Sequence, residues 1–147
     1  MPELIDLAPN KSLICKLWRI EEGEVIMDPK TKLSLNDYKL FLNKKLKHHQ
    51  SQFLASRKLI SQVHSDLRVS YKDDIPFLSD NRNISISHSE NVVTILISEN
   101  KGIGIDVERI NNKVHSIKSK FLNQKEINYL SGYEESRNLT RAWTAKE

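Results

Sequence analysis

The sequence predicts an α+β fold, because strand-like and helix-like patterns occupy separate stretches of one chain of 147 residues. In residues 13–20, apolar side chains alternate between two faces, as they do in a β-strand. From Ser34 onwards, apolar residues recur at the intervals of one helical face. A chain of this length is usual for one domain. We therefore expect strands and helices around a modest core.

The N-terminal part of the chain should alternate between regular elements and turns. The strand at 13–20 is followed by a turn-rich stretch, and a helix then begins at Ser34. Its predicted apolar face consists of Leu35, Tyr38, Leu42 and Leu46. A second helix should cover residues 50–67. Residues 73–83 predict a loop, because Pro76 and a cluster of Asp and Asn residues interrupt regular structure there.

The C-terminal part begins with a predicted hairpin. Strands are expected at 84–88 and 92–98, joined by a tight Ser-Glu-Asn connection. A turn then leads to a short strand at 103–107. Helices should follow near residues 114–121, 124–130 and 136–147. No internal repeat or linker separates these elements.

Composition and charge restrict the classes of partner and compartment. The formal net charge of +4 favours an anionic partner, which could be nucleic acid, a phosphorylated cofactor or an acidic protein. The single cysteine, Cys15, excludes an internal disulfide and a cysteine zinc cluster. No apolar run approaches the roughly 20 residues of a membrane span. The first residues carry acids and prolines where a signal peptide would be basic and then apolar, so we expect a cytoplasmic protein.

Two carboxylates, Asp106 and Glu108, form a candidate metal site. In an extended strand their side chains point to the same face, with Cα atoms about 6.5–7 Å apart. Mg²⁺ commonly takes one or two carboxylates and completes its shell with water and phosphate. The alternative is an edge strand with two solvated acids. The apolar residues around the pair favour a buried strand facing a cleft, where a cation would relieve the repulsion between the two charges.

Two further stretches carry candidate functional side chains, each with a structural alternative. On a helix over residues 141–147, Trp143 and Glu147 lie one turn apart with Lys146 beside them. That stretch could equally be an amphipathic helix with the tryptophan in the core. In the strand at 84–88, His88 shares a face with two isoleucines, and it could be a hydrogen-bonded histidine at a strand end.

In their order and spacing, these stretches resemble the 4′-phosphopantetheinyl transferase superfamily. The resemblance lies in S-H at 87–88, G-I-D-V-E at 104–108 and W-T-A-K-E at 143–147. The stretch KFLNQKE at 120–126 resembles the family's segment with a phenylalanine and then a glutamate. Farther back, HHQSQFLASRKLI resembles a family helix whose arginine meets coenzyme A, which corresponds to Arg57.

The residues ahead of the aspartate strand make the chain similar to the longer, surfactin-synthetase-activating type. That type is an α+β pseudo-dimer of two related halves, here residues 1–100 and an incomplete second half at 101–147. Relatives continue beyond the last motif, whereas this sequence stops at Glu147. The resemblance leaves three explanations open: a truncated gene, a fragment, or assembly as a homo-oligomer in which another copy supplies the missing packing.

The resemblance implies a reaction and a set of catalytic groups. The enzyme would move phosphopantetheine from coenzyme A to a serine of an acyl or peptidyl carrier protein, releasing 3′,5′-ADP. Asp106, Glu108 and Glu147 would hold Mg²⁺. Glu147, or a water that it orients, would be the general base. Lys146 would bind coenzyme A and neutralise charge on the leaving oxygens.

The resemblance also implies a phosphate-binding group. Ser87 and His88 would donate hydrogen bonds near the 3′-phosphate of coenzyme A, with His88 counted among the catalytic residues. Arg57 would add a charge-assisted contact to the same phosphate, and Lys44 and Lys45 are further candidates. Relatives often carry G-K-P before the S-H strand, where this chain has D-I-P at 74–76, so the family lysine is absent and Lys72 is a candidate replacement.

Glu126 has two possible roles, one structural and one in metal binding. With Asn123 three residues earlier, it predicts a capping box at the start of a helix, a structural use that we favour over metal binding.

Other functional classes remain as alternatives. A truncated relative could be a non-catalytic module that binds coenzyme A or a carrier protein. The basic run at 44–49 suggests nucleic acid, but aromatic residues are not interleaved with it and no recognised motif is present, so we expect no nucleic-acid partner. A nuclease using Asp106 and Glu108 is a weaker alternative. The carrier partner should be acidic because the chain is basic.

Overall fold

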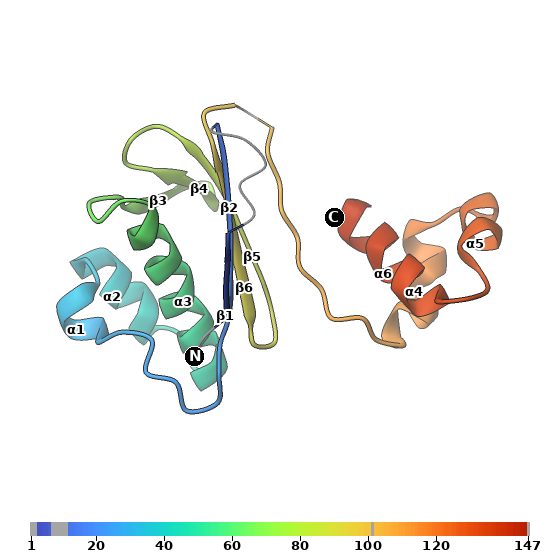
Figure 1. Cartoon of the computed structure of the whole chain (residues 1–147), viewed down its shortest axis with the longest axis horizontal. Coiled ribbons are helices and arrows are strands. Elements are labelled where there is room, and N and C mark those ends of the chain that lie inside the picture. Colours follow the sequence, from blue (N-terminus) through green and yellow to red (C-terminus); the bar gives the residue numbers. More distant parts are fainter. Residues whose placement is uncertain (1–2, 7–11, 101, 147) are drawn as a thin grey trace. The chain divides into compact units, whose positions relative to one another are not determined.

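The computed structural model describes residues 3–6, 12–100 and 102–146 and confirms the α+β class (Figure 1). The chain divides into two compact units, Met1–Ile105 and Asp106–Glu147. Their assignment to the two related halves of a pseudo-dimer remains a prediction. No described helix has both the length and the apolar character needed to cross a membrane.

The first unit is built on a six-stranded antiparallel sheet in the order β1-β2-β6-β5-β4-β3. Its strands are β1 (Glu3–Asp6), β2 (Leu13–Arg19), β3 (Val69–Lys72), β4 (Ile75–Leu78), β5 (Asn83–Ser89) and β6 (Val92–Ser98). The predicted strand at 13–20 and the predicted β5–β6 hairpin are confirmed. Glu90 supplies the left-handed residue of the hairpin turn, with φ 50°.

The predicted loop at 73–83 is partly wrong, because it contains β4, which pairs with the unpredicted strand β3. Asp73 and Asp74 form the turn between them with φ values of 51° and 62°, a conformation that aspartate tolerates better than most residues. Pro76 is accommodated because β4 pairs with β5 only at Phe77, so the missing N–H of the proline costs little.

Helix α3 (Lys47–Val63) covers one face of the sheet (Figure 1). It is fixed there by an apolar core of buried residues: Trp18, Ile26, Ala55, Leu59, Ile60, Leu67, Leu78, Ile84, Val93, Ile95 and Ile97. Ile14 and Ile20 pack against this core on the same face of β2 as Trp18, which agrees with the alternation predicted for residues 13–20. The predicted helix at 50–67 starts earlier than expected and ends at Val63.

Two short helices, α1 (Pro29–Lys32) and α2 (Leu35–Leu42), precede α3. The helix predicted to begin at Ser34 is confirmed, and Ser34 is its N-cap. The predicted apolar face of this helix is wrong: Leu35 is 71% exposed and Leu42 is 58% exposed. The buried residue of α2 is instead Asp37, which has an ionic partner on α3.

The predicted strand at 103–107 is also wrong, because this segment forms neither strand nor helix. The backbone N–H of Ile105 donates to the Ser85 hydroxyl on β5 at 3.1 Å, not to a backbone carbonyl of an adjacent strand. Asp106 and Glu108 therefore lie on irregular backbone.

The second unit contains α4 (Lys113–Phe121), α5 (Gln124–Leu130) and α6 (Glu135–Lys146), which confirms the three predicted helices. A small core formed by Val114, Leu122 and Leu139 holds them together. The capping box at the start of α5 is confirmed, with Asn123 accepting from the Glu126 N–H and Glu126 accepting from the Asn123 N–H.

Candidate functional site

The site residues predicted from the sequence fall into two groups, one in each unit. The first unit carries Arg57, Ser87 and His88, and the second carries Asp106, Glu108 and Lys146. Glu147 lies outside the described residues.

A cavity of about 390 Å³ in the first unit brings Arg57 and His88 together. Arg57 comes from α3 and His88 from β5. The cavity is lined by Lys44, His49, Gln52, Phe53, Ser56, Arg57, Tyr71, Asp74, Pro76, Ile86 and His88. Ser87 does not line this cavity, because successive side chains of β5 point to opposite faces. Lys72 and Lys45 do not line it either, and Lys44 is the lysine that does.

Arg57 is buried and held in place by α2. Its Nε donates to Oδ1 of Asp37 at 2.9 Å, and its Nη2 lies 2.8 Å from the same oxygen. Nη1 donates to the Ser56 hydroxyl and Nη2 to the Tyr71 hydroxyl, each at 3.3 Å. The guanidinium carbon lies 4.2 Å from the ring centroid of Phe53. A buried ion pair of this kind needs such additional hydrogen bonds to offset the desolvation of two charges.

His88 belongs to a cluster of basic side chains. Part of its imidazole is exposed, but burial of the remainder lowers its pKa, and the nearby charges of His49, Lys44 and His48 lower it further. The rings of His48 and His49 lie 4.1 Å apart. We call His48, His49, His88 and Lys44 the histidine cluster. A bound anion would be attracted by each of its members.

Sequence reasoning missed several lining residues of this cavity. His49, Gln52, Phe53 and Ser56 recur on α3 at intervals of three and four, ahead of Arg57. These residues share one face of the helix, and this periodicity was a signal that could have been found in the sequence. Asp37 could not have been found in this way, because its contact with Arg57 spans 20 residues.

In the second unit, Lys146 lies at the junction of all three helices. Its Nζ donates to Oε1 of Glu126 at 2.6 Å and to the Phe121 carbonyl at 3.1 Å. Trp143, one turn earlier on α6, packs edge-to-face on Phe121 with the ring centroids 5.1 Å apart. Trp143 is half-buried and packs against the small core of this unit, which agrees in part with the structural alternative.

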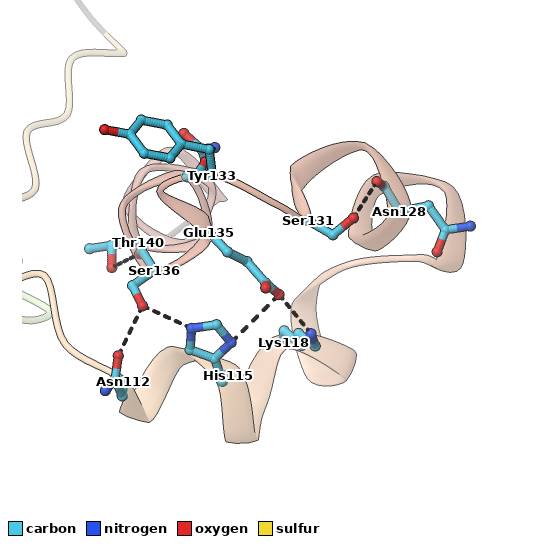
Figure 2. A network of polar contacts seen from close by, with 10 residues as sticks. Asn112, His115, Lys118, Asn128, Ser131, Tyr133, Glu135, Ser136 and Thr140 are labelled. Atoms are coloured by element: carbon cyan, nitrogen blue, oxygen red, sulfur yellow. Dashed lines mark hydrogen bonds and ion pairs between the residues drawn. The ribbon is translucent and has the colours of Figure 1, made fainter.

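The start of α6 is tied to α4 by a polar network (Figure 2). The Ser136 hydroxyl donates to Oδ1 of Asn112 at 2.9 Å and lies 2.8 Å from Nε2 of His115. On the other side of the ring, Nδ1 of His115 is 3.5 Å from Oε1 of Glu135. Lys118 donates to the same oxygen at 2.9 Å, and this bond lowers the pKa of Glu135. Helix α6 is thus fixed to α4 at its start and, through Lys146, at its end.

The candidate metal ligands Asp106 and Glu108 precede α4. Oδ2 of Asp106 is shielded from solvent, whereas Glu108 is exposed and lines a cavity of about 190 Å³ with Trp143 and Lys113. Two carboxylates two residues apart fit Mg²⁺, which accepts hard oxygen ligands and fills its other positions with water or phosphate. In the part of the chain that the structure describes, no group of three or more His, Cys, Asp or Glu side chains could hold a metal ion.

Comparison with known families links the second group of residues to one superfamily. Residues 102–147 match the family model of the 4′-phosphopantetheinyl transferase superfamily. The matched stretch contains Asp106, Glu108 and Lys146, and it does not extend to Arg57 or His88. No match was found among curated proteins.

Proposed function

We propose that the protein transfers the 4′-phosphopantetheine group from coenzyme A to a carrier-protein serine in a Mg²⁺-dependent reaction. The observation that carries this proposal is the match of residues 102–147 to the transferase superfamily, across the stretch that holds the candidate metal ligands. The first unit supports it independently, because Arg57 and His88 line one cavity with further basic side chains. We further propose that the protein acts in the cytoplasm.

In this proposal the cavity of the first unit binds the 3′-phosphate end of coenzyme A. Arg57 and His88 would meet the phosphate, and Lys44 and His49 line the same cavity. Charge-assisted hydrogen bonds of this type are stronger than neutral ones. Arg57 already donates to Asp37, Ser56 and Tyr71, so its orientation is fixed before a ligand arrives. Ser87, on the other face of β5, would contact a different part of the substrate.

The residues of the second unit would act on the pyrophosphate. Asp106 and Glu108, together with Glu147, would hold Mg²⁺, which when bound neutralises negative charge on the pyrophosphate. Glu147 would accept the proton of the carrier serine hydroxyl while the serine oxygen forms a bond to the β-phosphorus of coenzyme A. The bond from that phosphorus to the oxygen of 3′,5′-ADP breaks, and Lys146 would stabilise the charge that develops on the leaving oxygen. Phosphoryl transfer depends mainly on such positioning and charge neutralisation.

The carrier protein would be acidic. The chain carries a formal net charge of +4, and complementary charge accelerates the encounter of two proteins. The acyl or peptidyl character of the carrier is part of the proposal.

Mass spectrometry of a carrier protein tests the proposed function. After incubation with the protein, coenzyme A and MgCl₂, the carrier should gain the mass of one phosphopantetheine group, and 3′,5′-ADP should appear in equal amount. Chelation of Mg²⁺ should stop the reaction. Binding of coenzyme A without any mass gain would favour the non-catalytic module instead.

The variant Asp106→Ala provides the matched test of the metal assignment. Transfer should fall by at least about 100-fold, because a ligand of the ion that neutralises the pyrophosphate is lost. Circular dichroism should remain unchanged, since Asp106 lies on irregular backbone outside the helices and strands. Turnover close to that of the unsubstituted protein would remove Asp106 from the metal site.

A further inference from the structure

We propose that Glu126 is a positioning residue that holds Lys146 for the transfer step. This inference rests on the proposed function, since it assigns Lys146 to the leaving oxygen. It concerns a contact between α5 and α6 that lies wholly within the second unit.

The two carboxylate oxygens of Glu126 have separate partners. Oε2 accepts the backbone N–H of Asn123 at 2.8 Å, which completes the capping box at the start of α5. Oε1 accepts Nζ of Lys146 at 2.6 Å. Because the first bond fixes the carboxylate to the helix start, the second fixes the ammonium group to the same point.

A second contact completes the position of Lys146. Its Nζ also donates to the carbonyl of Phe121, the last residue of α4, at 3.1 Å. An ammonium group has three N–H donors, so two are occupied and one can point to a ligand oxygen. A lysine side chain is otherwise flexible, and these two contacts select one position for its charge.

The pair is suited to orientation more than to stability. The Lys146 and Glu126 side chains are 42% and 35% exposed, and ion pairs this exposed contribute little net stability. The hydrogen bond from Lys146 is also the main reason why the pKa of Glu126 is lowered. The carboxylate is therefore ionised at neutral pH and available to hold the ammonium group.

Glu126→Gln separates the two roles of Glu126. Glutamine can still accept the Asn123 N–H and keep the capping box, but it lacks the charge that holds Lys146. We expect kcat to fall about tenfold while the KM for coenzyme A changes by less than about twofold. In Lys146→Ala, kcat should fall about 100-fold, because the hydrogen-bond donor to the leaving oxygen is itself removed.

A double variant shows whether Glu126 acts through Lys146. If it does, Glu126→Gln combined with Lys146→Ala should be no slower than Lys146→Ala alone. Asn123→Ala is the matched control, since it removes the other half of the capping box and leaves the Glu126–Lys146 contact in place. This control should unfold at a lower temperature with kcat unchanged.

Three outcomes would overturn the inference: unchanged kcat in Glu126→Gln, independent multiplication of the two effects in the double variant, or an equal loss of kcat in Asn123→Ala. A separate measurement does not depend on turnover. NMR relaxation of the Lys146 ammonium nitrogen should show greater mobility in Glu126→Gln, and unchanged mobility would also overturn it. If the unsubstituted protein modifies no carrier, the proposed function is contradicted. The relaxation measurement still shows whether Glu126 holds the Lys146 ammonium group.

Discussion

His88 shows how a single residue can couple ligand binding to protons. Burial and the charges of His49, Lys44 and His48 lower its pKa, so its imidazole is mainly neutral at pH 7. A phosphate bound beside it would favour the protonated form and raise that pKa. Binding of an adenosine 3′,5′-bisphosphate should therefore take up protons near pH 7 and tighten as the pH falls from 8 to 6.

Calorimetry in buffers of different ionisation enthalpy measures this uptake directly. His88→Gln should reduce the number of protons taken up. His64→Gln is the control. His64 follows the C-terminal end of α3, does not line the 390 Å³ cavity and does not belong to the histidine cluster. Equal proton uptake in all variants would contradict the role of the cluster.

The buried pair of Asp37 and Arg57 leads to a prediction about stability. Asp37→Ala leaves the Arg57 charge buried without its counter-ion, which should lower the free energy of unfolding by about 3–5 kcal/mol. Replacing both residues, as in Asp37→Leu with Arg57→Met, should recover most of that loss, because no buried charge remains. Urea unfolding measures both changes.

The same double variant separates folding from binding. It should fold and yet bind coenzyme A more weakly, because the guanidinium that lines the cavity is gone. If the double variant unfolds at the same low urea concentration as Asp37→Ala, the unpaired charge of Arg57 is not the cause of the loss of stability.

At the scale of elements, the β3–β4 hairpin depends on two consecutive left-handed residues. Asp73 has φ 51° and is exposed. Asp73→Gly should leave stability nearly unchanged, whereas Asp73→Val should lower it by about 1–2 kcal/mol, because a β-branched residue is strained in this conformation. Thermal unfolding of the two variants side by side checks the turn, and an equal effect of both would contradict the left-handed assignment.

The elements also show which sequence patterns are sufficient to predict a helix or a strand. The helices of the second unit could be predicted because periodicity and the Asn123–Glu126 capping box agree locally. The segment at 103–107 alternates as a strand does, but alternation over five residues is too short a pattern to establish a strand, and the backbone there is irregular. Strands β1 and β3 were missed because each is only four residues long and its identity depends on a partner.

The candidate site was predictable to a similar degree. Arg57 and His88 were assigned to one ligand from a resemblance, and the structure places both on one cavity, although the identity of that ligand remains a proposal. Partners distant in the chain were not predictable. Asp37 meets Arg57 across 20 residues and Glu126 meets Lys146 across the same separation, and no local pattern marks either contact.

At the scale of the whole molecule, the division into two units can be tested by proteolysis. The stretch at 103–111 contains no helix or strand, and Arg109 within it is exposed. Trypsin should therefore cut after Arg109 before it cuts within α3 or α6, giving two fragments divided four residues beyond the boundary between the units. Mass spectrometry of early fragments identifies the site, and first cleavage inside α3 would contradict the division.

The attachment of α2 has a thermodynamic consequence of its own. This helix exposes Leu35 and Leu42 to solvent, and Asp37 holds it to α3 through an ion pair, so the apolar surface that its release would hydrate comes mainly from the half-buried rings of Tyr38 and Phe41. Heat capacity rises on unfolding mainly because apolar surface is hydrated. Detachment of α2 would accordingly raise the heat capacity much less than melting of the α3–sheet core. Arg57 lines both the 390 Å³ cavity and a second cavity of about 470 Å³ that Asp37 also lines, so loss of the ion pair on release of α2 would alter the walls of both.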